Sequence, residues 1–135
     1  MNRARTLFLV AILASLSACK SKADQCNAFV EEAGKSQEAL GDNVKPDAFK
    51  AAAAKIDESA KRLDALKIDD KQLTGFRTRY VEGIVLTSKA LVQFADSVND
   101  PAKQADAEKA KKDLDAVEQR EKKLIDEINA YCQSK

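Results

Sequence analysis

Apolar residues recur every three or four positions along most of the chain, which is the spacing of one face of an α-helix. The pattern predicts four helices, at about residues 24–40, 46–67, 70–98 and 101–132. Residues typical of helix ends lie at the predicted boundaries. Gly41 follows the first helix, and Pro46 and Pro101 lie at the starts of the second and fourth. Because short connections make consecutive helices antiparallel neighbours, the sequence predicts an all-α fold, an up-down-up-down four-helix bundle.

The last two predicted helices have the most informative apolar patterns. The third is apolar around much of its circumference, which predicts a place among the other helices. Gly83, inside this helix, costs about 1 kcal/mol relative to alanine and indicates either close packing of a neighbour or a small apolar cavity. The fourth carries a heptad seam interrupted by one acid, Glu121. The first predicted helix carries an apolar stripe that contains Phe29 and Val30, and we expect this stripe to face the core.

The chain begins with a different pattern, in which Arg3 and Arg5 precede an apolar run. The run is too short to span a bilayer, and small residues follow it, as in an export signal. It ends in Leu16-Ser17-Ala18-Cys19. We therefore expect a cleaved signal over residues 1–18, a tether over 19–23 and the bundle domain over 24–135.

The four residues Leu16 to Cys19 resemble the lipobox of bacterial lipoproteins. The resemblance implies that Cys19 is linked to diacylglycerol and becomes the acylated first residue of the mature chain. Several acyl chains, at about 0.8 kcal/mol per buried methylene, hold a protein at a membrane almost permanently. Lys20 stands where lipoproteins retained in the inner membrane of enteric bacteria usually carry Asp, so the resemblance favours the outer membrane. The alternatives are an ordinary secretory signal or an uncleaved anchor helix.

Two further cysteines, Cys26 and Cys132, lie close to the two ends of the predicted domain. Export places them in an oxidising compartment, where a pair of cysteines is normally bridged. In the predicted topology the end of the fourth helix returns to the start of the first. We therefore predict a Cys26–Cys132 disulfide, which would contribute about 4 to 5 kcal/mol by closing a long loop. The alternatives are two buried thiols or an intermolecular bond.

Charge and composition limit the chemistry that the chain can perform. Losing Arg3 and Arg5 with the signal reduces 23 basic residues to 21, against 22 acidic ones, so no strong field attracts nucleic acid. The chain has no histidine. It therefore cannot form a Glu-x-x-His di-iron site, a Cys-x-x-Cys-His haem attachment or a triad with a histidine base. We expect no enzymatic activity, no cofactor and no bound metal.

Two polar features remain as candidate sites. We expect Glu121 to lie near the rim of the bundle and reach water, with a buried pair to Arg77 or Arg79, or a ligand contact, as alternatives. Arg77, Arg79 and Tyr80 could bind an anion near the start of the third helix, although an exposed charged turn is the simpler interpretation.

These features predict a membrane-anchored envelope lipoprotein that acts as a non-enzymatic interaction or structural component. Its expected partners are the membrane, through lipid on Cys19, and another envelope protein. The alternative is a binding protein that holds a small apolar ligand between its helices. A large exposed apolar patch would favour the first hypothesis, and an enclosed apolar cavity near Gly83 would favour the second.

Overall fold

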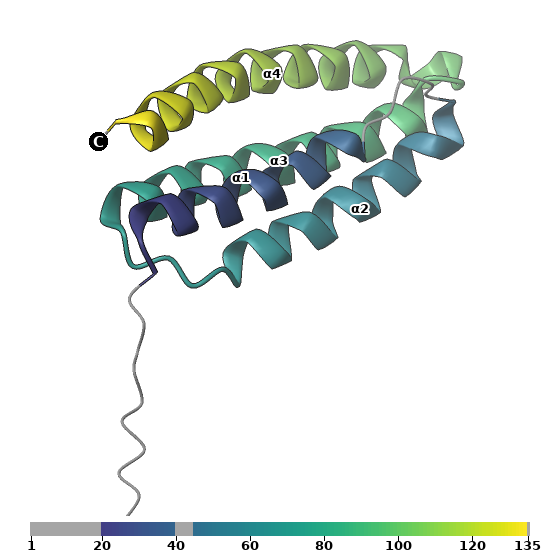
Figure 1. Ribbon diagram of the computed structural model, residues 1–135. Helices are drawn as coiled ribbons and strands as arrows, with labels where there is room; N and C mark the ends of the chain where they lie inside the picture. Colours follow the sequence, from purple (N-terminus) through teal and green to yellow (C-terminus); the bar gives the residue numbers. More distant parts are fainter. Residues whose placement is uncertain (1–19, 40–44, 135) are drawn as a thin grey trace, which may run out of the picture.

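The computed structural model describes residues 20–39 and 45–134. Within these ranges it contains four α-helices and one short 3-10 helix. They are α1 (Lys22–Glu38), α2 (Pro46–Asp64), α3 (Lys71–Ser97), η1 (Pro101–Lys103) and α4 (Gln104–Gln133). Consecutive α-helices run in opposite directions (Figure 1). The predicted all-α, up-down-up-down four-helix bundle is therefore confirmed.

α1 begins two residues earlier than predicted because Ser21 caps it. The Ser21 hydroxyl accepts a hydrogen bond from the Asp24 backbone N–H at 3.1 Å, and the Asp24 carboxylate accepts one from the Ser21 backbone N–H at 3.1 Å. This reciprocal pair satisfies two backbone donors that a helix start leaves without partners. The predicted end of this helix at residue 40 lies outside the described residues.

The turn between α2 and α3 is longer than predicted. α2 ends at Asp64 instead of residue 67, and the Arg77 guanidinium donates a hydrogen bond to the Leu66 carbonyl oxygen at 2.6 Å. Asp70 caps α3, because its carboxylate accepts from the Leu73 backbone N–H at 2.9 Å. The extra residues allow the turn to pass beneath the start of α1.

The start of the fourth predicted helix is also different. Pro101 to Lys103 form the single turn η1, and the regular α-helical pattern begins only at Gln104. Asp100 caps η1, accepting from the Ala102 backbone N–H at 2.9 Å. The difference is confined to the hydrogen-bond pattern of the first turn, which is often 3-10 at a helix start.

The core lies around α3, which packs along α2 on one side and along α4 on the other. α1 completes the bundle but is shorter, and its contact with α4 is much less extensive than the contacts that α3 makes. All four α-helices supply buried apolar side chains. The core includes Cys26, Phe29, Ile56, Leu63, Leu73, Phe76, Tyr80, Ile84, Leu91, Leu124 and Ile128. The predicted central position of the third helix is confirmed, and the least closed side of the bundle lies between α1 and α4.

Candidate functional site

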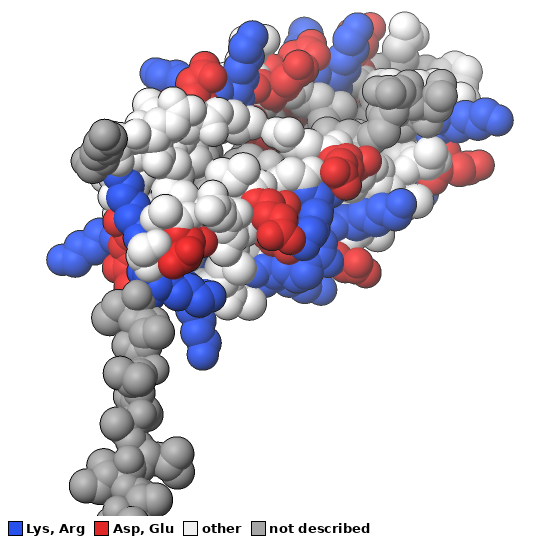
Figure 2. Space-filling model, viewed as in Figure 1, with Lys and Arg blue, Asp and Glu red and all other residues white. Residues whose placement is uncertain are grey.

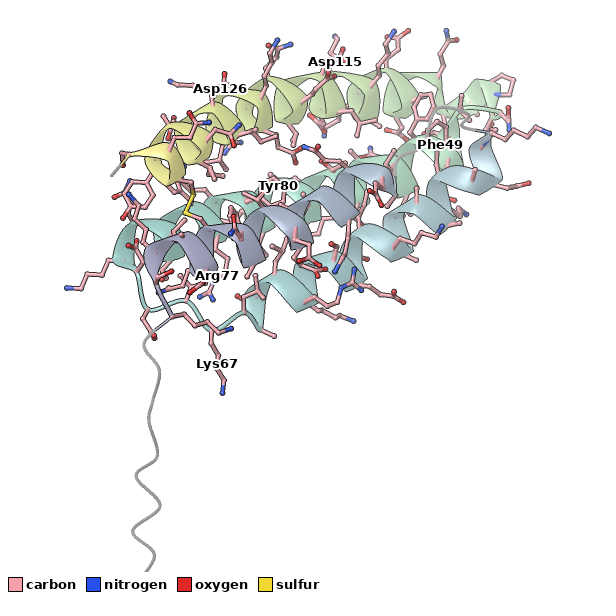
Figure 3. The ribbon with its side chains drawn as sticks, viewed as in Figure 1. Phe49, Lys67, Arg77, Tyr80, Asp115 and Asp126 are labelled. Atoms are coloured by element: carbon pink, nitrogen blue, oxygen red, sulfur yellow. A yellow bond between two sulfur atoms is a disulfide. The ribbon has the colours of Figure 1, made fainter. Side chains whose placement is uncertain are left out.

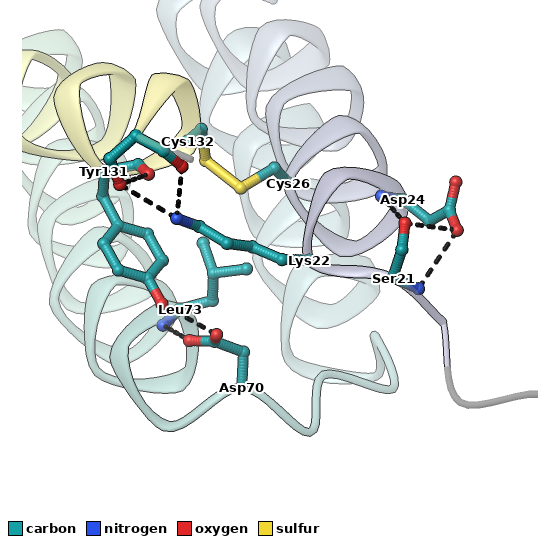
Figure 4. Close-up of a disulfide and its surroundings, with 9 residues drawn as sticks. Ser21, Lys22, Asp24, Cys26, Asp70, Leu73, Tyr131 and Cys132 are labelled. Atoms are coloured by element: carbon teal, nitrogen blue, oxygen red, sulfur yellow. Dashed lines mark hydrogen bonds between the residues drawn. A yellow bond between two sulfur atoms is a disulfide. The ribbon is translucent and has the colours of Figure 1, made fainter.

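A disulfide joins α1 and α4 at the end of the bundle where the described chain begins. Cys26 and Cys132 form the predicted bond, with their Cα atoms 5.9 Å apart and 106 positions between them in sequence (Figure 4). Cys26 is buried among the core side chains. The bond is the covalent link between two helices that otherwise touch little, so it determines how closely α1 approaches α4.

Polar contacts around the disulfide tie α1, α3 and α4 together. The Tyr131 hydroxyl donates a hydrogen bond to the Asp70 carboxylate at 2.8 Å (Figure 4). The Lys22 ammonium lies 4.1 Å from the centre of the Tyr131 ring. It also donates a hydrogen bond to the Ser134 carbonyl oxygen at 2.8 Å. The Leu73 backbone N–H, followed by the Tyr131 hydroxyl, lowers the pKa of Asp70. This end of the bundle, from which the predicted tether leaves, is therefore closely fastened.

Gln25 makes a second junction at the same end. Its amide oxygen accepts from the backbone N–H groups of Asp69 and Asp70, at 2.8 and 3.1 Å, and its amide nitrogen donates to the Lys20 carbonyl oxygen at 2.9 Å. Gln25 is buried. The side chain therefore positions the α2–α3 turn against the start of α1.

A groove runs between α1 and α4 beyond the disulfide. It has a volume of about 120 Å³ and is lined by Phe29, Val30, Ala33, Gly34, Gln37, Tyr80, Ile125, Ile128 and Asn129. Uncharged atoms gather between these two helices, with charged side chains on either side (Figure 2). Val30 is 47% exposed at its edge, so the prediction that Val30 faces the core is wrong. We call this region the α1–α4 groove.

The floor of the α1–α4 groove is rigid and apolar. The rings of Phe29 and Tyr80 meet edge to face with centroids 5.9 Å apart, and Tyr80 extends from α3 toward α1 (Figure 3). The Tyr80 hydroxyl lies 2.8 Å from the Ser36 hydroxyl and donates to the Ala33 carbonyl oxygen at 3.1 Å. Burial raises the pKa of Tyr80. A ligand in the groove would therefore meet a surface whose buried hydroxyl is already hydrogen-bonded.

Glu32 lies on the other side of α1, between α1 and α2. Although it is charged, it is only 7% exposed. Its carboxylate pairs with Arg62, lies 3.1 Å from the Lys35 ammonium and accepts from the Ser59 hydroxyl at 3.4 Å. Burial alone would raise its pKa, but the hydrogen bonds from Arg62 and Lys35 outweigh it and lower the pKa. The charge is therefore compensated, and it joins α1 to α2.

Glu121 packs on Gly83, where α4 crosses α3. A Cβ atom added at Gly83 would lie 3.2 Å from the Glu121 carboxylate, which accepts a hydrogen bond from the Thr87 hydroxyl at 3.4 Å. Close packing therefore explains Gly83. The hollow beside it, about 250 Å³, is lined largely by charged side chains including Arg79, Glu82 and Lys123, so the apolar cavity that we considered near Gly83 is wrong.

The arginines considered as partners of Glu121 bind elsewhere. Arg79 pairs with Glu127 at 2.7 Å, and Arg77 donates to the Leu66 carbonyl oxygen. Tyr80 is buried under α1 (Figure 3). The buried pair with Glu121 and the anion-binding cluster are therefore both wrong, because the three side chains project from α3 in different directions.

Glu121 should make stability depend on pH. Burial raises its pKa, so the folded protein holds a proton that an unfolded chain releases at about pH 4. Below that pH the side chain is protonated in both states, so Glu121 does not make stability depend on pH there. The free energy of unfolding then falls as the pH rises through the pKa of Glu121 in the folded state. We expect Glu121→Gln to raise Tm at pH 7 and to leave it nearly unchanged below about pH 4, as measured by circular dichroism.

Glu32→Gln provides the matched control for this experiment. Because the pKa of Glu32 is lowered in the folded state, its ionised form stabilises the protein above the unfolded pKa, and this contribution is lost on acidification. Glu32→Gln should lower Tm at pH 7 and lose that effect at low pH. A lower Tm at pH 7 for Glu121→Gln would contradict a raised pKa caused by the partial burial of its carboxylate.

The described residues also bear on metal binding and on membrane insertion. No group of three or more His, Cys, Asp or Glu side chains among them could hold a metal ion. No helix in residues 20–39 and 45–134 is long and apolar enough to cross a membrane. Cys19, the predicted lipidation site, lies outside the described residues, and the predicted domain boundaries at residues 18 and 23 stay predictions.

Comparison with known proteins covers residues 13–19 as well as the bundle. A family model described as "Uncharacterised lipoprotein PM1805" matches residues 13–132, a range that contains Cys19, Cys26 and Cys132. No curated protein and no solved structure matches the chain. The match extends from the end of the apolar run to the second bridged cysteine and supports a lipid-anchored location in the cell envelope. The chain therefore belongs to the PM1805 family of bacterial lipoproteins.

Proposed function

We propose that this lipoprotein is a non-enzymatic interaction component of the cell envelope that binds a partner protein through the α1–α4 groove. The groove itself is the observation that carries the proposal. One third of the residues in the chain are charged, yet the groove lining contains no charged side chain among its described residues. An apolar depression with an exposed aliphatic edge is typical of a surface that another protein covers.

The size of the groove favours a protein over a small ligand. Pockets for small molecules usually measure about 300 to 1,000 Å³, whereas this groove measures about 120 Å³. It has room for one large apolar side chain, which is how anchor residues bind at protein interfaces. A larger hollow of about 560 Å³ lies along α2, α3 and η1, but it is lined by Asp57, Lys89 and Asp96 among others. Such a charged lining does not suit an apolar ligand.

The position of the groove limits where the partner can be. Phe29 and Gln37 lie roughly 10 and 23 Å from the start of α1 at 1.5 Å per residue. Only Lys20 and Ser21 separate α1 from Cys19, the residue that we propose carries the lipid. The groove would then stand close to the membrane surface, within reach of another membrane protein. Lys20 after Cys19 favours the outer membrane as that surface.

Photo-crosslinking in the native host tests this function. A photoreactive amino acid at position 30 of the full-length protein should give a discrete adduct, because Val30 lies at the edge of the groove. The same residue at Ala54, an exposed apolar position on α2, is the control and should give little. Adding Gly34→Glu should remove the adduct from position 30. Equal labelling at both positions, or none at position 30, would contradict the proposed function.

A further inference from the structure

α1 carries a second stripe of residues that faces away from the core. The stripe consists of Ala23, Asn27, Val30, Gly34 and Gln37, spaced by four, three, four and three residues. This is the heptad spacing of a helix that packs along another helix. None of the five is charged, and all except the half-buried Gly34 are exposed. We call it the outer stripe of α1, and its central residues border the α1–α4 groove.

Gly34 lies in the middle of the outer stripe, where the chain's own fold does not require a glycine. A Cβ atom added there would meet nothing within 4 Å. Glycine inside a helix costs about 1 kcal/mol relative to alanine, and the usual reason to keep one is close approach of another backbone. At Gly83 the space beside the glycine is filled by the Glu121 side chain of the same chain. At Gly34 that space is open, which leaves room for the close approach of a helix from another molecule.

The side chains of the outer stripe suit a partner that presents the same stripe. Around a two-fold axis parallel to α1, each residue of the stripe meets its own copy. A charged residue would then repel itself, whereas the amides of Asn27 and Gln37 both donate and accept hydrogen bonds and so can pair with their copies. In this heptad Asn27 occupies an a position, where asparagine specifies the register of paired helices.

Each copy exposes one large aliphatic side chain on α1 and has one small apolar groove beside it. Val30 is the large aliphatic side chain that α1 exposes, at 47%, and the adjacent groove of about 120 Å³ has room for one such side chain. When two α1 helices pack side by side, each Val30 packs beside its own copy, at the edge of the other copy's α1–α4 groove. Each copy then contributes an exposed aliphatic side chain and an apolar groove edge.

We infer that the partner in the α1–α4 groove is a second copy of this chain, with the two α1 helices parallel. This inference rests on the proposed function, because it names the protein that the groove binds. The N-terminal residues outside the described range end at Cys19, and only Lys20 and Ser21 lie between Cys19 and α1. Two copies with this short tether in one membrane present α1 at the same height and in the same direction. Confinement to that surface raises their effective concentration.

Cysteine crosslinking of the full-length protein in host membranes tests the inference. Gly34→Cys should form a covalent species of twice the monomer mass under oxidising conditions. Gly75→Cys is the matched control, because a Cβ atom also meets nothing within 4 Å there, but Gly75 lies on α3 outside the groove. The doubled species should be at least about tenfold more abundant for Gly34→Cys, since packed helices hold the thiols together. Equal yields would overturn the inference.

Two more variants test the geometry. Ala23→Cys should also crosslink if the helices are parallel, whereas an antiparallel pair centred near Val30 would separate the two thiols by about 21 Å. Gly34→Glu has room in the monomer but places two like charges face to face, so it should weaken association at least about a hundredfold. Crosslinking at position 34 without position 23 would overturn the parallel arrangement.

The outcomes separate this inference from the proposed function. If position 30 gives an adduct with a different protein while Gly34→Cys gives no doubled species, the second copy is excluded and the groove still binds a partner. If positions 30 and 34 give no adduct of any kind, both the inference and the proposed function are overturned. A doubled species from Gly34→Cys with Gly75→Cys remaining monomeric supports both.

Discussion

Replacing Cys132 with serine is expected to lower the free energy of unfolding by about 4 to 5 kcal/mol under oxidising conditions. The bond closes a loop over 106 positions, so its loss frees the unfolded chain from a constraint on almost the whole bundle. In the folded state it joins the two neighbouring helices with little other contact. For a domain of this size the loss corresponds to a fall in Tm of roughly 15 to 20 °C, measured by circular dichroism.

The controls for this prediction are the other ways of removing the same bond. Cys26→Ser and the double variant should melt at about the same temperature as Cys132→Ser. Reductant should lower the Tm of the wild-type protein to that value and leave the double variant unchanged. An unchanged Tm in Cys132→Ser would mean that the bond does not form in the protein as it is exported.

Phe29→Ala should cost about 3 to 5 kcal/mol, the usual range for truncating a fully buried aromatic side chain. Phe29 is 0% exposed and packs edge to face on Tyr80. Through this residue the shortest α-helix of the bundle contacts the core, so the cavity left by alanine would lie where α1 is held. The free energy of unfolding in urea measures the effect, and Phe29→Leu should cost less than about 1.5 kcal/mol.

The neighbouring residue is the matched control. Val30→Ala should change the free energy of unfolding by no more than about 0.5 kcal/mol, because Val30 is 47% exposed. The two substitutions are adjacent in sequence and both shorten an apolar side chain. If they cost the same, Val30 would belong to the core and the α1–α4 groove would lose its exposed edge.

The predicted fold depended on periodicity, which is a strong signal in long helices. The heptad seam of α4 and the apolar circumference of α3 predicted their packing, and Pro46 and Pro101 located two helix starts. The α2–α3 turn was less predictable. Its end point depends on Gln25, from a distant part of the chain, bonding to the backbone of Asp69 and Asp70. The helix propensities of the residues in the turn do not indicate that contact.

The candidate site was harder to predict, because adjacent residues on a helix differ by only about 100° in direction. Phe29 and Val30 both seemed to belong to one apolar stripe, yet one lies in the core and the other at the groove. Likewise, Glu31 is exposed, whereas Glu32 beside it is buried by its contacts with Arg62 and Ser59. The sequence signal for the groove was the regular spacing of three uncharged polar or small residues on α1, namely Asn27, Gly34 and Gln37.

The lipid anchor was the best-defined functional prediction from the sequence, because a lipobox is a short linear motif that needs no tertiary structure. The family match supports the lipoprotein assignment, although Cys19 itself lies outside the described residues. The groove, by contrast, exists only because α1 and α4 approach each other at the disulfide and remain in limited contact elsewhere. Its chemistry depends on the packing of distant segments and could not be deduced from any one of them.

The most direct test of a lipid-anchored, disulfide-closed bundle is the intact mass of the protein extracted from host membranes without reductant. The account predicts the mass of Cys19 to Lys135 plus acyl groups, less two hydrogens for the Cys26–Cys132 bond. The bare mature chain, or the full chain with residues 1–18 retained, would contradict lipid attachment at Cys19. A mass without the loss of two hydrogens would contradict the bridge that sets the distance between α1 and α4.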